Sequence, residues 1–284
     1  MVREFKIINE KGQEFSLMDI QEYCLLTDPT DLGISYTTEY EQVGNNFILN
    51  KKNIEQKNPS GTLNFINYDN YYKFINFIES SKSLKLYYKV PFENSSPREY
   101  YKDIDFALLE KTEIKPEGVI SELVTFNSLS LWYEENETTY DITAQENEMR
   151  YDYRWDSRYT TYNKRSIVYD NKGHVEAPIK VEIDGYIENP SIQILVDNEV
   201  VSEITVPVII NDFEKFCYSS KTGDIYIKKQ KADGTFENLF VNEYIDISNN
   251  NIFKLPIGAS EIRLVSDEEI TSAKLTVYPQ YKAV

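Results

Sequence analysis

Histidine and cysteine, the side chains behind most acid–base, thiol and zinc chemistry, are nearly missing from this chain. The sequence has one histidine, His174, and two cysteines, Cys24 and Cys217. His174 lies in the turn-like segment NKGH, and each cysteine follows an aromatic residue, which is typical of a small apolar side chain in a strand. So few donors leave little material for a catalytic or zinc site. We therefore expect no catalytic residues, no cofactor and no metal.

Sequence motifs for catalysis are also missing. The chain contains no GxSxG elbow, no GxGxxG or GxxxxGK[ST] phosphate loop, no HExxH and no paired CxxC. Two carboxylates could hydrolyse a glycoside, but Asp and Glu together number 47, so their presence carries no information. Glycoside chemistry is therefore left open by the residues alone.

Aromatic residues alternate with basic ones between residues 150 and 166, and Trp155 lies at the centre of this stretch. Such a stripe can stack on nucleic-acid bases or on sugars. The net charge of −17 is spread through both halves and disfavours phosphate backbones and anionic membranes. We expect no membrane partner and no sequence-specific nucleic acid, and we keep Trp155 as a candidate for sugar stacking. Trp132 is a weaker candidate, because SLSLWY alternates like a buried strand.

The N-terminal residues, MVREFKIINEKGQEF, contain no apolar run, and no stretch approaches the roughly 20 apolar residues of a membrane span. We expect no signal peptide and synthesis in a cytoplasm.

Strand patterns dominate the rest of the chain, with one exception. Gly44-Asn45-Asn46 predicts a turn between two strands. Tyr71, Phe74, Ile75 and Ile78 follow helical spacing, with Asp69 as the expected N-cap and Ser80-Ser81 as the end. The strands of residues 83–114 are long enough for an extended hairpin arm. The polar stretch 134–148 reads as a joint, which predicts domains at 1–138 and 139–284.

In their order, these segments resemble the distal tail proteins of siphophages, the phage tail-component family. The resemblance covers nearly the whole chain, and Lys111-Thr112-Glu113 is its signature in the third block. The matching blocks are FSLMDIQEYCLLTDPTDLGISYTTEYEQVGNNFI (15–48), SGTLNFINYDNYYKFINFIESSKSLKLYY (60–88), YYKDIDFALLEKTEI (100–114), LVTFNSLSLWYEE (123–135), KRSIVYDNKGHVEAPIKVEIDGYIENPSIQI (164–194) and NIFKLPIGASEIRLV (251–265).

The resemblance implies a mainly β fold: an N-terminal β-barrel-like domain with one helix and an extended hairpin, then a C-terminal galectin-like β-sandwich. It implies a structural, non-enzymatic subunit of the virion tail tip, usually a hexameric ring. One face of the ring would meet the tail tube protein and the other the tail-associated hub or fibre protein. In some relatives the C-terminal domains anchor receptor-binding proteins. The galectin sugar-site pattern is missing here, so an adaptor or spacer role is expected.

A closed ring needs an interface between two different surfaces of one protomer, and a hairpin arm laid on a neighbour supplies one. Within the arm predicted at 83–114, Tyr100, Tyr101 and Phe106 are candidate anchors, and Lys111 and Glu113 are further interface candidates. The alternative for each ring is packing inside its own domain.

Two other functions stay open. One is a carbohydrate-binding β-sandwich protein acting in host cell-surface adhesion. The other is a related baseplate or tube subunit of a contractile tail or a tail-like bacteriocin.

Overall fold

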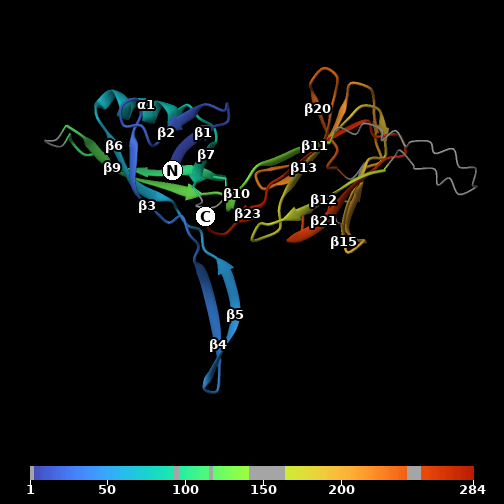
Figure 1. Cartoon of the computed structure of the whole chain (residues 1–284), viewed down its shortest axis with the longest axis horizontal. Coiled ribbons are helices and arrows are strands. Elements are labelled where there is room, and N and C mark those ends of the chain that lie inside the picture. The colour runs from blue at the N-terminus through green and yellow to red at the C-terminus, as the bar shows by residue number, and fades with distance from the viewer. Residues whose placement is uncertain (1–2, 92–95, 115–117, 141–163, 242–250) are drawn as a thin grey trace, which may run out of the picture. The chain divides into compact units, whose positions relative to one another are not determined.

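The computed structural model describes residues 3–91, 96–114, 118–140, 164–241 and 251–284 (Figure 1). It is mainly β, as predicted, with a single helix among those residues. Contacts divide the chain into two units, Met1–Glu134 with Tyr281–Val284, and Glu135–Gln280. Below, these are called unit 1 and unit 2. Residues 141–163 lie outside the described residues, and with them most of the aromatic–basic stretch 150–166, including Trp155.

Unit 1 is built on one antiparallel sheet whose main path has the order β2-β1-β7-β8-β9-β6-β3. Side chains alternate between its faces; on β9, for example, Ile120, Val124 and Phe126 are buried. The strands are β1 (Glu4–Asn9), β2 (Glu14–Ser16), β3 (Leu25–Thr30), β6 (Ser60–Phe65), β7 (Leu84–Val90), β8 (Arg98–Leu109) and β9 (Ile120–Ser128), with β10 (Trp132–Tyr133) and β23 (Gln280–Tyr281) off this path.

Helix α1 (Tyr68–Glu79) covers the core face of this sheet, and Phe74 packs edge-on against Phe15 at 5.3 Å between ring centroids. The predicted spacing is confirmed, since Tyr71, Phe74 and Ile78 are buried and Ser80 caps the C-terminal end. The predicted N-cap was wrong.

The N-cap is Asn67, whose extended backbone lets its side chain accept a hydrogen bond from the Asn70 backbone amide at 2.8 Å. Asp69 lies inside the first turn, where a carboxylate faces the positive end of the helix dipole.

Replacing Asn67 by alanine should therefore lower the free energy of unfolding by about 1 kcal/mol. Asp69→Ala is the matched control and should lose about 0.5 kcal/mol, because only the interaction with the dipole is removed. Urea denaturation followed by the helix signal in circular dichroism measures both values. A larger loss for Asp69→Ala than for Asn67→Ala would contradict this cap.

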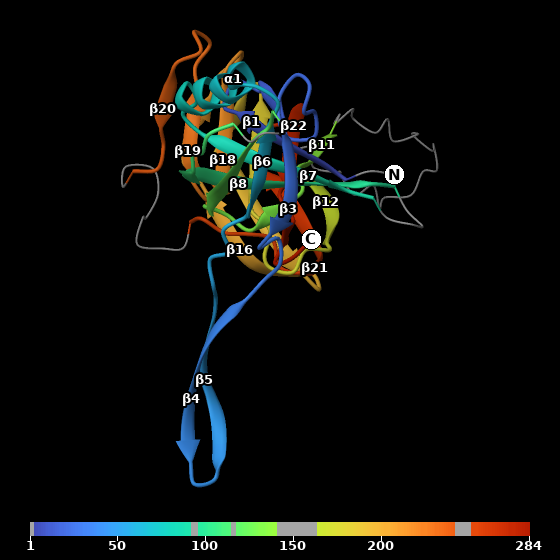
Figure 2. The ribbon, with the colours of Figure 1, turned by 90° about the vertical axis from the view of Figure 1, so that its left-hand side faces the viewer.

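An extended hairpin leaves unit 1, formed by β4 (Tyr36–Val43) and β5 (Asn46–Ile54) (Figure 2). We call it the arm. Within the described ranges the two strands pair only with each other, and the predicted turn at Gly44 joins them with φ +63°. The arm's predicted location at 83–114 was wrong. Residues 84–109 form β7 and β8, which lie inside the sheet between β1 and β9, so their side chains are used for packing in unit 1.

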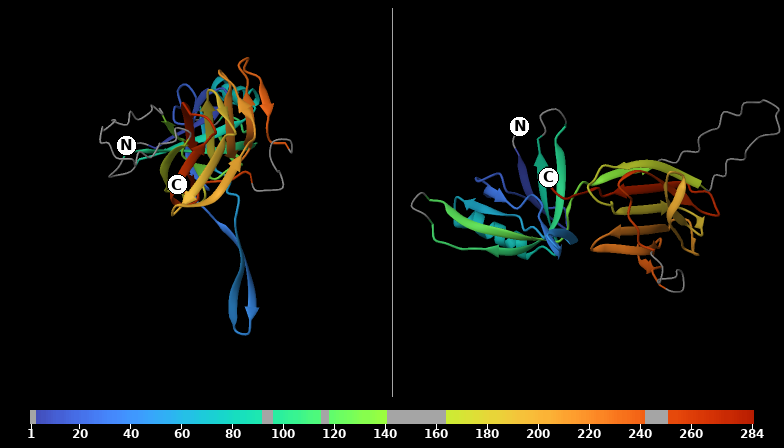
Figure 3. Two further views of the ribbon diagram at one scale, coloured as in Figure 1. Left: turned by 90° about the vertical axis from the view of Figure 1, so that its right-hand side faces the viewer. Right: turned by 90° about the horizontal axis from the view of Figure 1, so that it is seen from below.

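Unit 2 contains a six-stranded sheet in the order β11-β22-β13-β18-β19-β20 and a four-stranded sheet in the order β12-β21-β15-β16 (Figure 3). Apolar side chains from both sheets form one core, in which Val181, Tyr218 and Ile194 are fully buried. Strands β14 and β17 form a separate two-stranded ribbon. The strands are β11 (Asn136–Tyr140), β12 (Lys164–Asn171), β13 (Ile179–Asp184), β14 (Ile187–Glu188), β15 (Ser191–Val196), β16 (Glu199–Thr205), β17 (Ile209–Ile210), β18 (Lys215–Lys221), β19 (Asp224–Gln230), β20 (Phe236–Asn238), β21 (Gly258–Val265) and β22 (Ser272–Val277).

Candidate assembly interface

The two faces of the arm differ in chemistry. Cross-strand partners in a hairpin share a face. The pairs Tyr36–Ile54, Tyr40–Leu49 and Gln42–Phe47 therefore lie on one side. The other side carries Glu39 opposite Lys51 and Thr37 opposite Asn53, with Ile48 and Val43 near the turn. We call the first side the apolar arm face: Tyr36, Tyr40, Phe47, Leu49 and Ile54.

Every member of the apolar arm face is exposed, with Phe47 at 70% and Tyr40 at 61% of their full accessible surface. Exposed apolar residues on a soluble protein are ordinary when scattered, but several gathered on one face mark an interaction site. Here the Thr38–Lys52 pair separates Tyr36–Ile54 from the outer group of Tyr40, Leu49 and Phe47. Both edges of the arm also leave backbone groups unpaired, because no third strand joins it among the described residues. The arm therefore offers a partner an apolar face and free hydrogen-bonding edges.

The base of the arm contacts the C-terminal segment of unit 1 through Lys282, whose ammonium lies 5.9 Å from the Tyr36 ring centroid. Lys52, which belongs to the arm itself, lies 4.0 Å from the same centroid. Lys57 forms an ion pair with Asp31 at 3.1 Å, which joins the segment that enters the arm to the segment that leaves it. The Lys282 contact helps to fix where the arm begins, whereas β4 and β5 share backbone pairing only with each other among the described residues.

The predicted interface residues on β8 are divided between the two faces of its sheet. Tyr100 is 4% exposed and packs edge-on against Tyr281, and Phe106 packs on Phe74 and Phe126 in the core. Tyr101 is half-buried on the other face, next to Tyr87 and Tyr133. Tyr100 and Phe106 thus fill their own unit, and a role for Tyr101 at an interface stays a prediction.

Lys111 and Glu113 both reach the first residue of α1. The Tyr68 hydroxyl donates to Glu113 Oε2 at 3.0 Å, and the Lys111 ammonium lies 5.8 Å from the Tyr68 ring centroid. Between them, the Thr112 amide donates to Glu122 Oε1 at 2.7 Å. The signature segment is therefore fastened to the unit it belongs to, and its exposed side chains remain only predicted contacts for a neighbour.

Two buried ionisable residues of unit 1 were missed from the sequence. Glu122 is completely buried, and its Oε2 has no hydrogen-bond partner among the described residues. Lys102 is 4% exposed, its ammonium lies 5.0 Å from the Trp132 ring, and burial lowers its pKa to about 8. The signal was available: both stand at core-facing positions of alternating strands, where an apolar residue is the rule.

Both cysteines are buried. Burial raises the pKa of both thiols, to about 11 for Cys217, so each stays protonated and unreactive near neutrality. Across the described ranges, no three His, Cys, Asp or Glu residues are placed to hold a metal ion. Nor does any helix in that part of the chain combine the length and apolar character needed to cross a bilayer.

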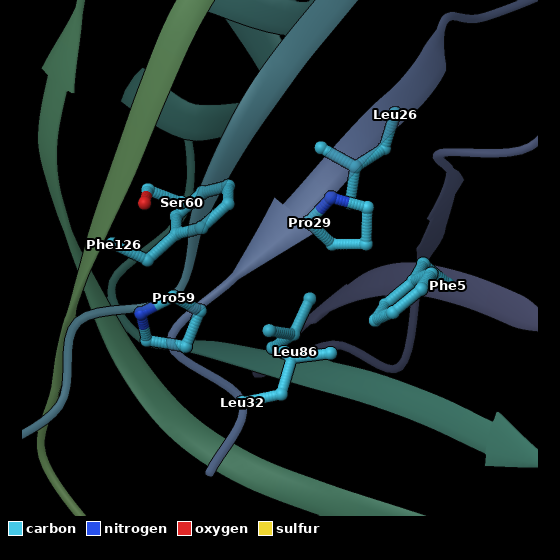
Figure 4. Close-up of a pocket in the computed structure, with 8 residues that line it drawn as sticks. All are labelled: Phe5, Leu26, Pro29, Leu32, Pro59, Ser60, Leu86 and Phe126. Atoms are coloured by element: carbon cyan, nitrogen blue, oxygen red, sulfur yellow. The ribbon is translucent and has the colours of Figure 1, made fainter.

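A small pocket in unit 1 lies near the base of the arm (Figure 4). Its volume of about 10 Å³ is room for roughly one water molecule, and its lining is almost wholly apolar, which rules out a cofactor at this place. The lining residues are Phe5, Leu26, Pro29, Leu32, Pro59, Ser60, Leu86 and Phe126.

Three comparisons with known proteins show what this chain is similar to. Residues 4–129 match the family model described as the distal tail protein, N-terminal domain. No curated protein matches the chain. A chain of the phage P2 baseplate, solved in its activated conformation with calcium, is 18% identical with a TM-score of 0.68, and each chain is covered completely.

The crystal structure of SPP1 Dit, described as a paradigm of the hub adsorption apparatus in phages that infect Gram-positive bacteria, is 11% identical. Its TM-score is 0.57, over 96% of this chain and 98% of that one. At such identities the likeness establishes a shared fold.

Proposed function

We propose that this chain, a phage distal tail protein by its N-terminal domain, closes into a ring of identical subunits through the arm. The chain is a structural component of a phage tail or baseplate, and the ring is the step that goes beyond this. In the proposed assembly, the apolar arm face of each copy lies on unit 1 of the next copy around the ring. Six copies are expected from the family resemblance.

The observation that carries this proposal is the exposure of the apolar arm face. An isolated two-stranded hairpin is marginally stable in water, and this one also leaves Tyr40 and Phe47 in solvent. Burying these rings against a neighbour would stabilise the arm and the assembly together, at about 25 cal/mol per Å² of apolar surface. The contact joins two different surfaces, as a closed ring requires.

The ring would join the tail tube protein on one side to the hub or fibre protein on the other. Unit 2 would act as an adaptor on such a ring, and its galectin-like character is part of the proposal. A non-enzymatic role is supported by the raised pKa of both thiols and by the baseplate setting of the solved structures with this fold. Trp155 lies outside the described residues, so sugar binding through it has no structural support here.

Native mass spectrometry of the purified full chain, alone and mixed with the tail tube or hub protein of the same phage, tests the proposal. The expected result is a species of six copies, formed by the chain alone or on addition of a partner. A chain that stays monomeric with every tail component offered would overturn ring formation.

A further inference from the structure

Phe213 in unit 2 is the most exposed large apolar residue among those described, at 88% of its full accessible surface. Its backbone has φ +67°, a left-handed conformation that is unfavourable for a bulky residue. The turn that imposes it is held by Glu214, whose Oε2 accepts from the Asn211 amide at 2.8 Å and from its side chain at 2.9 Å. The fold thus maintains a strained turn that points an aromatic ring into solvent.

Two more exposed apolar residues lie next to this turn. The ribbon β14–β17 pairs Ile187 with Ile210, both fully buried, and so turns Ile209 outward opposite Glu188. Tyr186 shares that outward side, because its hydroxyl donates to Glu188. The Gly185 amide donates to the Glu214 carbonyl oxygen at 3.4 Å, which brings the Phe213 turn beside Tyr186. Tyr186, Ile209 and Phe213 form what we call the Phe213 patch.

Four carboxylates border this patch, while the neighbouring Lys215 and Lys229 pair with Asp184 and Glu214 at 2.8 and 3.7 Å. The hydrogen bond to Glu188 is the largest cause that raises the phenol pKa of Tyr186. The negative charges of Glu268 and Asp212 raise this pKa further. The turn that carries Asp267 and Glu268 is fastened to the same ribbon, since the Asp267 amide donates to the Glu188 carbonyl oxygen at 3.0 Å. Over the described part of the chain, no lysine or arginine forms an ion pair with these four carboxylates.

We propose that the Phe213 patch docks unit 2 onto a different tail protein, one with an apolar pocket bordered by lysine and arginine. Phe213 enters the pocket and the rim carboxylates face the basic border, which matches the charge on both sides. A second copy of this chain is the poorer occupant, because two Phe213 patches facing each other would bring the rim carboxylates of both copies together. The inference rests on the proposed role as a tail component and names a contact outside the arm.

The test uses the full chain and each other tail protein of the same phage, purified and offered singly in biolayer interferometry. Phe213→Gly removes the aromatic side chain and relieves the left-handed strain, so the melting temperature of the variant should equal or exceed that of the parent. For the protein that binds, we expect its affinity to fall by about tenfold or more in this variant. Affinity should also fall between roughly 50 and 300 mM NaCl.

Ile257→Ser is the control, because Ile257 is 61% exposed but precedes the opposite end of β21 from the Asp267 turn; its binding should match the parent. Asp212→Lys should weaken binding and reduce the salt dependence. Unchanged binding by Phe213→Gly, no binding by any tail protein, or self-association that depends on Phe213 would each overturn the proposal. In native mass spectrometry, Phe213→Gly should assemble into the same subunit ring as the parent. Loss of that assembly in this variant would count against the arm proposal instead.

Discussion

A triple substitution on the arm, Tyr40→Ser with Phe47→Ser and Leu49→Ser, is expected to abolish ring assembly and leave a folded monomer. The three side chains are 49–70% exposed in the single chain, so their removal should change its free energy of unfolding by only about 0.5 kcal/mol each. In a ring they would be the buried anchors, and truncating anchors of this kind costs about 2 kcal/mol or more apiece. Because this binding free energy is lost at every contact around the ring, the assembled form should no longer be populated. Size-exclusion chromatography with light scattering measures the result.

The matched control lies on the opposite side of the same hairpin. Glu39→Gln with Lys51→Gln removes a cross-strand charge pair from the other face, at the same distance along the arm. This double variant should assemble like the parent protein, because exposed charges at a cross-strand position contribute little. Rings that survive the triple substitution, or that are lost in the control, would show that the apolar arm face does not make the contact.

Lys102→Met should stabilise unit 1 by about 1–3 kcal/mol at pH 7. Burial holds the pKa of Lys102 at about 8, against an ordinary value of 10.5, so the folded state carries an unfavourable buried charge at neutral pH. Each unit of pKa corresponds to about 1.4 kcal/mol, and the contact with the Trp132 ring offsets part of that cost. Methionine keeps most of the length of the side chain without the charge.

The pH dependence of folding stability tests the role of Lys102 in a second way. Below pH 8 the folded and unfolded states both hold the proton and the penalty is complete. As the pH rises from 8 toward 10.5, the folded state releases the proton first, so the parent protein gains stability. The advantage of Lys102→Met should therefore shrink at pH 9.5, whereas the exposed Lys11→Met should differ little from the parent at either pH. Urea titrations at both pH values decide this, and a destabilised Lys102→Met at pH 7 would mean that the ammonium is needed where it lies.

The sequence allowed the mainly β fold, the helix and the Gly44 turn to be predicted, because each is set by local spacing and turn chemistry. The resemblance to distal tail proteins is confirmed by the match over residues 4–129. Asn67 was missed as the N-cap because Asn67 and Asp69 stand two residues apart and both can cap. Only backbone geometry separates them, since the cap must be extended and Asp69 is already helical.

The location of the arm could not be derived from strand patterns. Residues 36–54 and 84–109 both read as hairpins, and whether a hairpin gains neighbours on both edges depends on the pairing of distant strands, here β1 and β9. Phe213 was missed for a related reason. One phenylalanine in a polar loop looks like any partly buried ring until its backbone and exposure are known.

The position of the arm in the assembled particle tests the central claim most directly. A cryo-electron-microscopy reconstruction of the phage baseplate, with this chain traced through residues 36–54, should place Tyr40 and Phe47 against the sheet of the adjacent copy in a closed ring. An arm that folds back on its own unit, or that reaches solvent with both rings uncovered, would contradict it.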